Sequence, residues 1–178
     1  MTTPPATDPE PRKESRWSSF FWSEENVAGA IYGQIVVMSV LVVFGADPEP
    51  KGAAVVVTVF VTSTVFWLAH VYSHLLGERI ERQRGATWAE IRKIAASESS
   101  IVQAATLPLV AVMLSLVGAF TPEQAVDIGI FVSLAQLALL GFYAAYRGGL
   151  RGWGVLVSGA ISLAFGLLIV VAKVFVGH

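Results

Sequence analysis

Residues 53–76 read AAVVVTVFVTSTVFWLAHVYSHLL, an almost unbroken apolar run. Its valines and threonines would favour a β-strand in a soluble protein, but a strand usually has only about five or six residues. A helix of about 20 apolar residues crosses the hydrocarbon core of a bilayer. The length of the run therefore predicts a transmembrane helix, and this prediction guides the interpretation of the remaining chain.

The composition of the whole chain agrees with a membrane protein. Of 178 residues, 54% are apolar and only 14% are charged, whereas soluble domains have about 25% charged residues. A soluble core of this size cannot bury so much apolar surface. The predicted fold class is all-α, an integral membrane bundle of five transmembrane helices. The spans are expected at about residues 27–44, 53–76, 99–119, 125–146 and 153–176.

The regions outside the spans have different compositions. Residues 1–16 contain four prolines and several charges without apolar periodicity, which predicts a disordered cytosolic tail before a membrane domain over 17–178. Thr87 and Glu90 form a capping-box pattern, which predicts an amphipathic cytosolic segment within residues 77–97. Pro108 lacks a backbone N–H and is expected to kink the third span.

Basic residues predict the orientation of the chain. Ten lie on the side that includes the N-terminus, and only Lys51 and Lys173 lie on the other. Cytosolic loops of membrane proteins are enriched in Lys and Arg, so the N-terminus is expected in the cytosol and the C-terminus outside. A preference for Arg over Lys, together with abundant Ala, Val and Gly, indicates a bacterial protein of the plasma membrane.

Small residues recur at four-residue spacing on two of the predicted helices. Such residues allow helix backbones to approach each other closely. They are expected to mediate packing either inside the bundle or in a homo-oligomer, and the sequence does not distinguish these two cases. The positions are Gly29, Gly33, Gly154, Ser158, Ser162 and Gly166.

His70, His74 and Glu78 follow one another at four-residue spacing and so share one helix face. Three interpretations are open. The residues could line a proton or metal-ion path, because imidazole titrates near neutral pH and binds divalent metals. They could instead be structural, with His70 hydrogen-bonded across a helix contact. A catalytic or cofactor site, such as haem or quinone, is the third possibility. Glu98 could pair with Arg82 or with a histidine.

Several polar residues are expected at a common depth in the cytosolic half of the bundle. With a rise of ~1.5 Å per residue, four of them lie roughly 12–16 Å below the cytosolic boundary, while Gln103 is shallower. Unpaired amides and imidazoles are costly in hydrocarbon, so these groups should face one another or a wet cavity. Together with the histidine face, the candidate cluster comprises His70, His74, Glu78, Gln34, Gln103, Thr106 and Gln136.

The sequence contains no cysteine and no recognisable nucleophile–base, P-loop or zinc-binding motif. A net charge of −1 argues against a nucleic-acid partner. We therefore expect a non-enzymatic membrane protein with a structural or accessory role, no cofactor, and the lipid bilayer as its main partner. The alternative is a proton- or metal-linked permease or channel subunit. That alternative requires His70, Gln34, Gln103 and Gln136 to converge on a common cavity.

Overall fold

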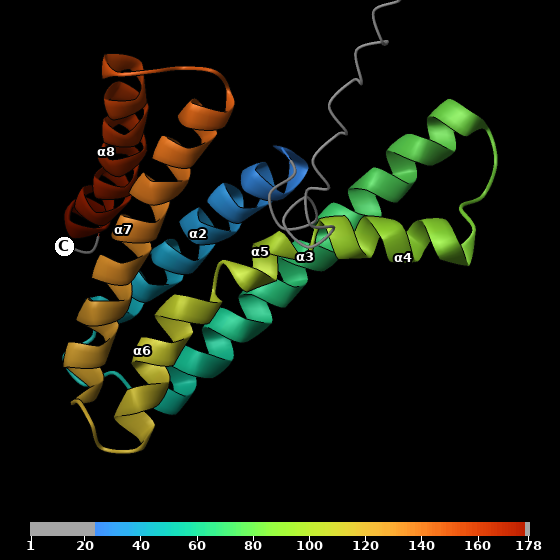
Figure 1. Ribbon diagram of the computed structural model, residues 1–178. Coiled ribbons are helices and arrows are strands. Elements are labelled where there is room, and N and C mark those ends of the chain that lie inside the picture. The colour runs from blue at the N-terminus through green and yellow to red at the C-terminus, as the bar shows by residue number, and fades with distance from the viewer. Residues whose placement is uncertain (1–23, 177–178) are drawn as a thin grey trace, which may run out of the picture.

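The computed structural model describes residues 24–176, and within this range it is helical with no strands (Figure 1). The predicted 1–16 tail lies outside the described residues. The helices are α2 (Glu24–Gly45), α3 (Gly52–Arg82), α4 (Trp88–Ser97), α5 (Ser100–Gln103), α6 (Thr106–Leu116), α7 (Pro122–Arg147) and α8 (Trp153–Val176). The α3–α4 and α7–α8 connections lie at one end of the bundle, here called the hairpin end, and the α2–α3 and α6–α7 connections lie at the opposite end (Figure 1).

Two apolar clusters hold the bundle together, and α2 contributes to both. One cluster joins α2 to α7, and Gly166 of α8 lies against its Met38, Leu134 and Leu137 side chains. The other joins α2, α3, α6 and α7 through Val37, Leu41, Val55, Val59, Ala105, Val112 and Val126. Because Val55 and Val59 are buried on the inner face of α3, its Val/Thr-rich half is stable as a helix despite its strand-like composition.

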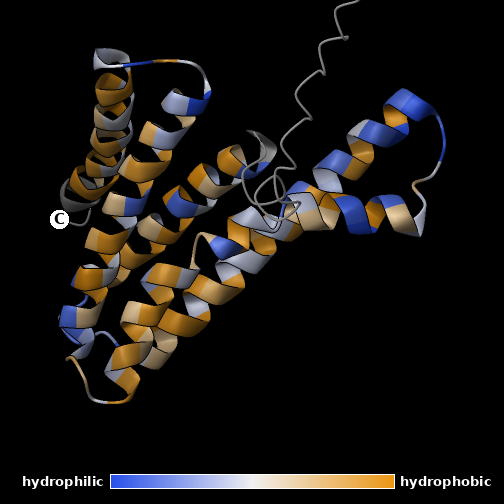
Figure 2. Ribbon diagram, viewed as in Figure 1, coloured by the Kyte–Doolittle hydropathy of each residue, from blue (hydrophilic) through white to orange (hydrophobic). Residues whose placement is uncertain are grey.

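The outer faces of the helices are also apolar. Phe60, Val65 and Leu68 of α3 and Ile161 and Leu168 of α8 are at least half exposed. Apolar residues cover most of the length of α3 and α8, and the strongly polar part of α3 lies at the end that leads into α4 (Figure 2). Soluble monomers rarely expose apolar surface continuously on this scale. In the described part of the chain, four helices are long and apolar enough to cross a membrane, or five if the helices on either side of a bend, Trp88–Gln103 and Thr106–Leu116, are counted as one span.

The third expected span is interrupted. The sequence predicted one kinked helix over 99–119, but the structure has α5 and α6 separated at Ala104 and Ala105, with a 53° bend between Trp88–Gln103 and Thr106–Leu116. The break lies four residues before Pro108. A proline removes the N–H that would bond the carbonyl of residue i−4, and its ring clashes with that carbonyl. The position of the break is therefore set by Pro108.

The interrupted segment formed by α5 and α6, here called the bent pair, runs alongside α3 from one end of the bundle to the other. Near the hairpin end, His74 Nε2 of α3 lies 3.5 Å from Glu98 Oε1, just before α5. At the opposite end, Gly52 begins α3, and an added Cβ there would lie 2.7 Å from Ser115 Oγ of α6. The two ends of the α5–α6 pair thus lie beside opposite ends of the apolar part of α3.

Most of the predicted small-residue positions pack inside this chain. Gly33 lies directly against the backbone of Ile101, and Gly29 lies against Ser100. On α8, Ser158 Oγ donates a 3.1 Å hydrogen bond to the carbonyl of Gly141, and Ser162 also lies against that glycine. Gly154, by contrast, is close only to Leu150 of the preceding turn. The small residues of α8 from Ser158 to Gly166, here called the α8 ladder, therefore pack against α7.

Candidate functional site

The interruption between α5 and α6 places a polar side chain of α7 beside a free carbonyl. Pro108 has no N–H to donate to Ala104 O. Gln136 Nε2 of α7 donates to this oxygen at 3.5 Å, the long limit for a hydrogen bond. An interruption inside a membrane helix is tolerated when neighbouring side chains satisfy the freed backbone groups. Gln136 thus compensates in part for the missing N–H of Pro108.

Gln34 of α2 lies at the same level as this interruption. Its neighbour Gly33 contacts Ile101. Further along α2, one and two turns after Gln34, the residues Val37 and Leu41 pack with Ala105. Gln34 is fully buried, and neither of its amide atoms has a hydrogen-bond partner among the described residues. A buried amide without a partner costs roughly 1–3 kcal/mol. Gln34 therefore contributes an amide without a partner among the described residues at the level of the interruption.

Serines on the neighbouring helices lie close to this level. Ser63 follows Val59 by one turn on α3, and Ser133 follows Gly129 by one turn on α7; Gly129 is itself beside Leu41 and Pro108 O. Both hydroxyls are buried without a partner among the described residues. We call this set the buried polar layer: Gln34, Ser63, Ser133 and Gln136. Its amides and hydroxyls are neutral, so the layer suits water or another neutral hydrogen-bonding molecule better than a divalent cation.

His70 does not join the buried polar layer. Its Nδ1 lies 3.1 Å from the Phe66 carbonyl of its own helix, and its ring packs against Tyr32 with centroids 4.6 Å apart. The sequence placed His70 beside the glutamines from depth alone, whereas the structure directs it to a local contact between α2 and α3. Among the described residues, His70 makes no hydrogen bond with Gln34, Gln103 or Gln136, and the histidine-lined path stays a prediction.

The other members of the predicted cluster are also dispersed. His74 contacts Glu98, which is the histidine partner that the sequence allowed for Glu98, and Glu78 pairs with Arg82 at 3.3 Å. Gln103 is exposed and donates to Ser99 Oγ, and Thr106 is exposed as well. Within residues 24–176, no group of three His, Cys, Asp or Glu side chains is arranged to hold a metal ion. Of the predicted cluster, Gln34 and Gln136 are the members that belong to the buried polar layer.

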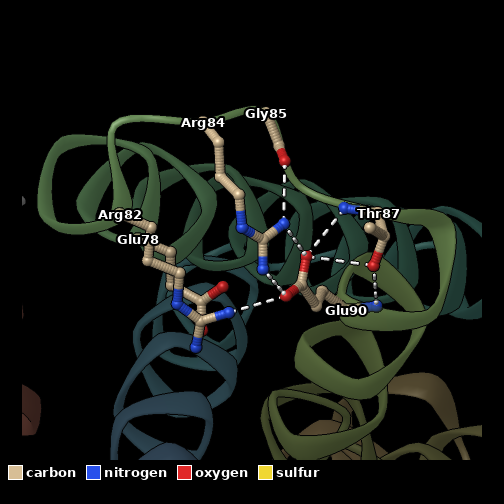
Figure 3. Close-up of polar contacts among 6 residues, drawn as sticks. All are labelled: Glu78, Arg82, Arg84, Gly85, Thr87 and Glu90. Atoms are coloured by element: carbon tan, nitrogen blue, oxygen red, sulfur yellow. Dashed lines mark hydrogen bonds and ion pairs between the residues drawn. The ribbon is translucent and has the colours of Figure 1, made fainter.

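The α3–α4 hairpin holds a charged network that the sequence analysis did not identify (Figure 3). Glu90 Oε1 lies 2.6 Å from Arg82 Nη1 and 2.6 Å from Arg84 Nη2. Its other oxygen accepts from the Thr87 N–H at 2.8 Å, as the predicted capping box requires. Below the network, Trp67 Nε1 donates to the Ala95 carbonyl at 3.0 Å. These contacts fix α4 against the end of α3.

The hydrogen bond from Arg84, with those from Thr87, lowers the pKa of Glu90 from 4.5 to about 2. The ionised form therefore stabilises the hairpin above pH 4.5, and this contribution disappears as the pH falls toward 2. We expect the Glu90 carboxyl of the protein in detergent micelles to titrate by NMR with a midpoint near 2. Arg84→Gln should raise the midpoint toward 4.5, and Arg92→Gln, an exposed arginine outside the network, should leave it unchanged. A wild-type midpoint near 4.5 would show that the network does not form.

Comparison with known proteins gives no relative: no family model, curated protein or solved structure matches this chain.

Proposed function

We propose that this chain is a multi-pass protein of a bacterial plasma membrane that acts as a structural or accessory component without catalysis. The observation that supports this proposal most directly is the state of its polar side chains. Four ionisable residues of the α3–α4 hairpin, Glu78, Arg82, Arg84 and Glu90, pair with one another, and His70 Nδ1 lies 3.1 Å from the Phe66 carbonyl of its own helix. Among the described residues Glu98 is also buried, and its carboxylate lies 3.5 Å from His74 Nε2. The buried polar layer itself consists of neutral amides and hydroxyls, which are poor general acids, bases and nucleophiles at neutral pH.

The distribution of charge supports an orientation with the hairpin end in the cytosol. In the described part of the chain, Lys51 lies at the opposite end of the bundle, and a larger group of basic residues lies at the hairpin end. This group consists of Arg79, Arg82, Arg84, Arg92, Lys93, Arg147 and Arg151. By the positive-inside rule, the N-terminus is cytosolic and the C-terminus is outside. Because the α8 ladder contacts α7, a second copy of the chain would have to dock on another face.

A second candidate function is a permease or channel subunit, and the buried polar layer favours it. Interrupted membrane helices are common at the binding sites of transporters, and here the interruption lies beside amide and hydroxyl atoms without partners. Since His70 and the carboxylates lie elsewhere, the permeant would be a small neutral molecule such as water, rather than a metal ion.

Flux measurements in proteoliposomes separate the two candidates. For a structural protein, osmotic water flux and proton flux should equal those of protein-free liposomes. Flux above that level that falls in Gln34→Leu but persists in Gln103→Leu would overturn the structural proposal in favour of a permease. Gln103→Leu is the matched control, because Gln103 is exposed on α5 and outside the layer.

A further inference from the structure

A hollow of about 750 Å³ opens at the hairpin end between the start of α2, the end of α7 and the loop into α8. It is separate from both the buried polar layer and the Glu90 network. Among the residues that line it are Val27 and Ile31 of α2, Tyr143, Tyr146 and Arg147 of α7, and Arg151 of the loop. The hollow is therefore lined by two arginines, Arg147 and Arg151, here called the rim, and by apolar residues of α2, here called the floor.

The two arginines at the rim differ from those of the α3–α4 hairpin. Arg82 and Arg84 are neutralised by Glu90. Arg147 and Arg151 are exposed and have no carboxylate within ion-pair distance in the described part of the chain, and none of the described lining residues is acidic. Arginine is well suited to bind phosphate, because its planar guanidinium can donate two parallel hydrogen bonds. The rim thus carries two positive charges without a partner within the described residues.

The backbone at the end of α7 favours an anion more than a bare helix C-terminus would. The last carbonyls of a helix normally carry partial negative charge. Here the Ala144 and Ala145 carbonyls accept from the N–H groups of Gly148 and Leu150, at 2.8 and 3.0 Å. Gly149, at φ +84°, permits this tight closure. Because these carbonyls are already hydrogen-bonded, the end of α7 repels a phosphate less than a bare helix end would. The positive charges of Arg147 and Arg151 therefore dominate the electrostatics of the hollow.

The floor distinguishes a lipid from a free anion. Val27, Ala28 and Ile31 present apolar surface along α2, and a small inorganic anion would gain nothing from it. A phospholipid can place its phosphate at the arginines and its first acyl carbons on this surface. Tyrosine side chains favour the headgroup level of a bilayer, which is where Tyr143 and Tyr146 would lie in the proposed orientation.

We propose that this hollow binds one anionic phospholipid, with its phosphate on Arg147 and Arg151 and its upper acyl chain along α2. The inference rests on the proposed placement of the chain in a membrane. Basic pockets between membrane helices on the cytosolic side are suited to anionic headgroups, and each basic residue near such lipids contributes about a factor of five in affinity.

Native mass spectrometry of the full-length protein in a non-ionic detergent tests the proposal. The probes are dioleoyl phosphatidylglycerol, dioleoyl phosphatidylcholine and inorganic phosphate. We expect phosphatidylglycerol to bind one molecule per chain and more tightly than phosphatidylcholine, with inorganic phosphate not competing at equal concentration. The double variant Arg147→Gln/Arg151→Gln should weaken phosphatidylglycerol binding by about 30-fold. Arg79→Gln/Arg92→Gln, which removes the same charge elsewhere at the hairpin end, should bind as the wild type does.

Three results would overturn the proposal: equal affinity for the two lipids, equal losses in the two double variants, or competition by inorganic phosphate. Phosphatidylglycerol binding that appears only after residues 1–23 are removed would also overturn it, because the chain itself would then occupy the hollow. Binding in micelles does not depend on topology. A failure here is therefore distinguishable from a failure of the proposed membrane orientation, which cysteine labelling tests separately.

Discussion

Gly33→Ala is expected to destabilise the bundle by about 2–3 kcal/mol, the upper range for overpacking a close contact. A Cβ at this position would lie 2.8 Å from Ile101 Cα and even closer to the Ile101 carbonyl oxygen. These are backbone atoms, so no side-chain rotation can relieve the clash, and α2 and α5 would have to move apart. The change should appear as a lower midpoint of unfolding in mixed SDS micelles.

Two other glycines serve as controls for Gly33. Gly77 of α3 has no atom of another residue within 4 Å of an added Cβ, so Gly77→Ala should leave stability unchanged or raise it by up to about 1 kcal/mol through helix propensity. Gly29→Ala should fall between the two, because its nearest neighbour is the Ser100 side chain, which can rotate. Equal midpoints for Gly33→Ala and Gly77→Ala would disprove the close contact between α2 and α5.

Gln136→Leu is expected to cost about 1–2 kcal/mol, because it leaves the Ala104 carbonyl buried without a donor. The expected cost of Gln136→Leu depends on whether residue 108 is a proline. In a Pro108→Ala background, the new N–H of residue 108 can bond Ala104 O, and Gln136→Leu should then cost markedly less. The double-mutant cycle, measured by SDS unfolding, should give a coupling energy of at least about 0.5 kcal/mol.

The exposed Gln103 provides the control for this cycle. Gln103→Leu should change stability by less than about 0.5 kcal/mol in either background, as expected for a substitution on the surface. If the costs of Gln136→Leu and Pro108→Ala are additive, the glutamine does not replace the proline's missing N–H.

The helices were largely predictable from the sequence because length and turn signals act locally. The expected spans at 27–44, 125–146 and 153–176 lie within α2, α7 and α8, and the Thr87 cap begins α4. The site of the break follows from the proline rule, although the sequence analysis placed only a kink there. These features depend on residues within about four positions of one another.

The side of each helix that faces the interior was not predictable. In a soluble helix the apolar stripe marks the buried face, but here both the interior and the outer face are apolar. Depth alone therefore placed His70 with Gln34, whereas in the structure His70 contacts the Tyr32 ring and the Phe66 carbonyl. The Thr87–Glu90 capping box was recognised. The approach of Arg82 and Arg84 to the same carboxylate depends on how the α3–α4 turn folds back, and no local pattern specifies that.

Cysteine labelling tests the central claim, that the bent pair crosses the membrane once and the bundle has five spans. The chain contains no cysteine, so single substitutions at Asp47, Gly85, Ala119 and Leu150 can be labelled without background. With a membrane-impermeant maleimide on intact cells, five spans predict labelling at positions 47 and 119, and labelling at 85 and 150 only after permeabilisation. Labelling at 150 in intact cells, together with protection at 119, would mean that α5–α6 re-enters on the same side, and would contradict the five-span fold.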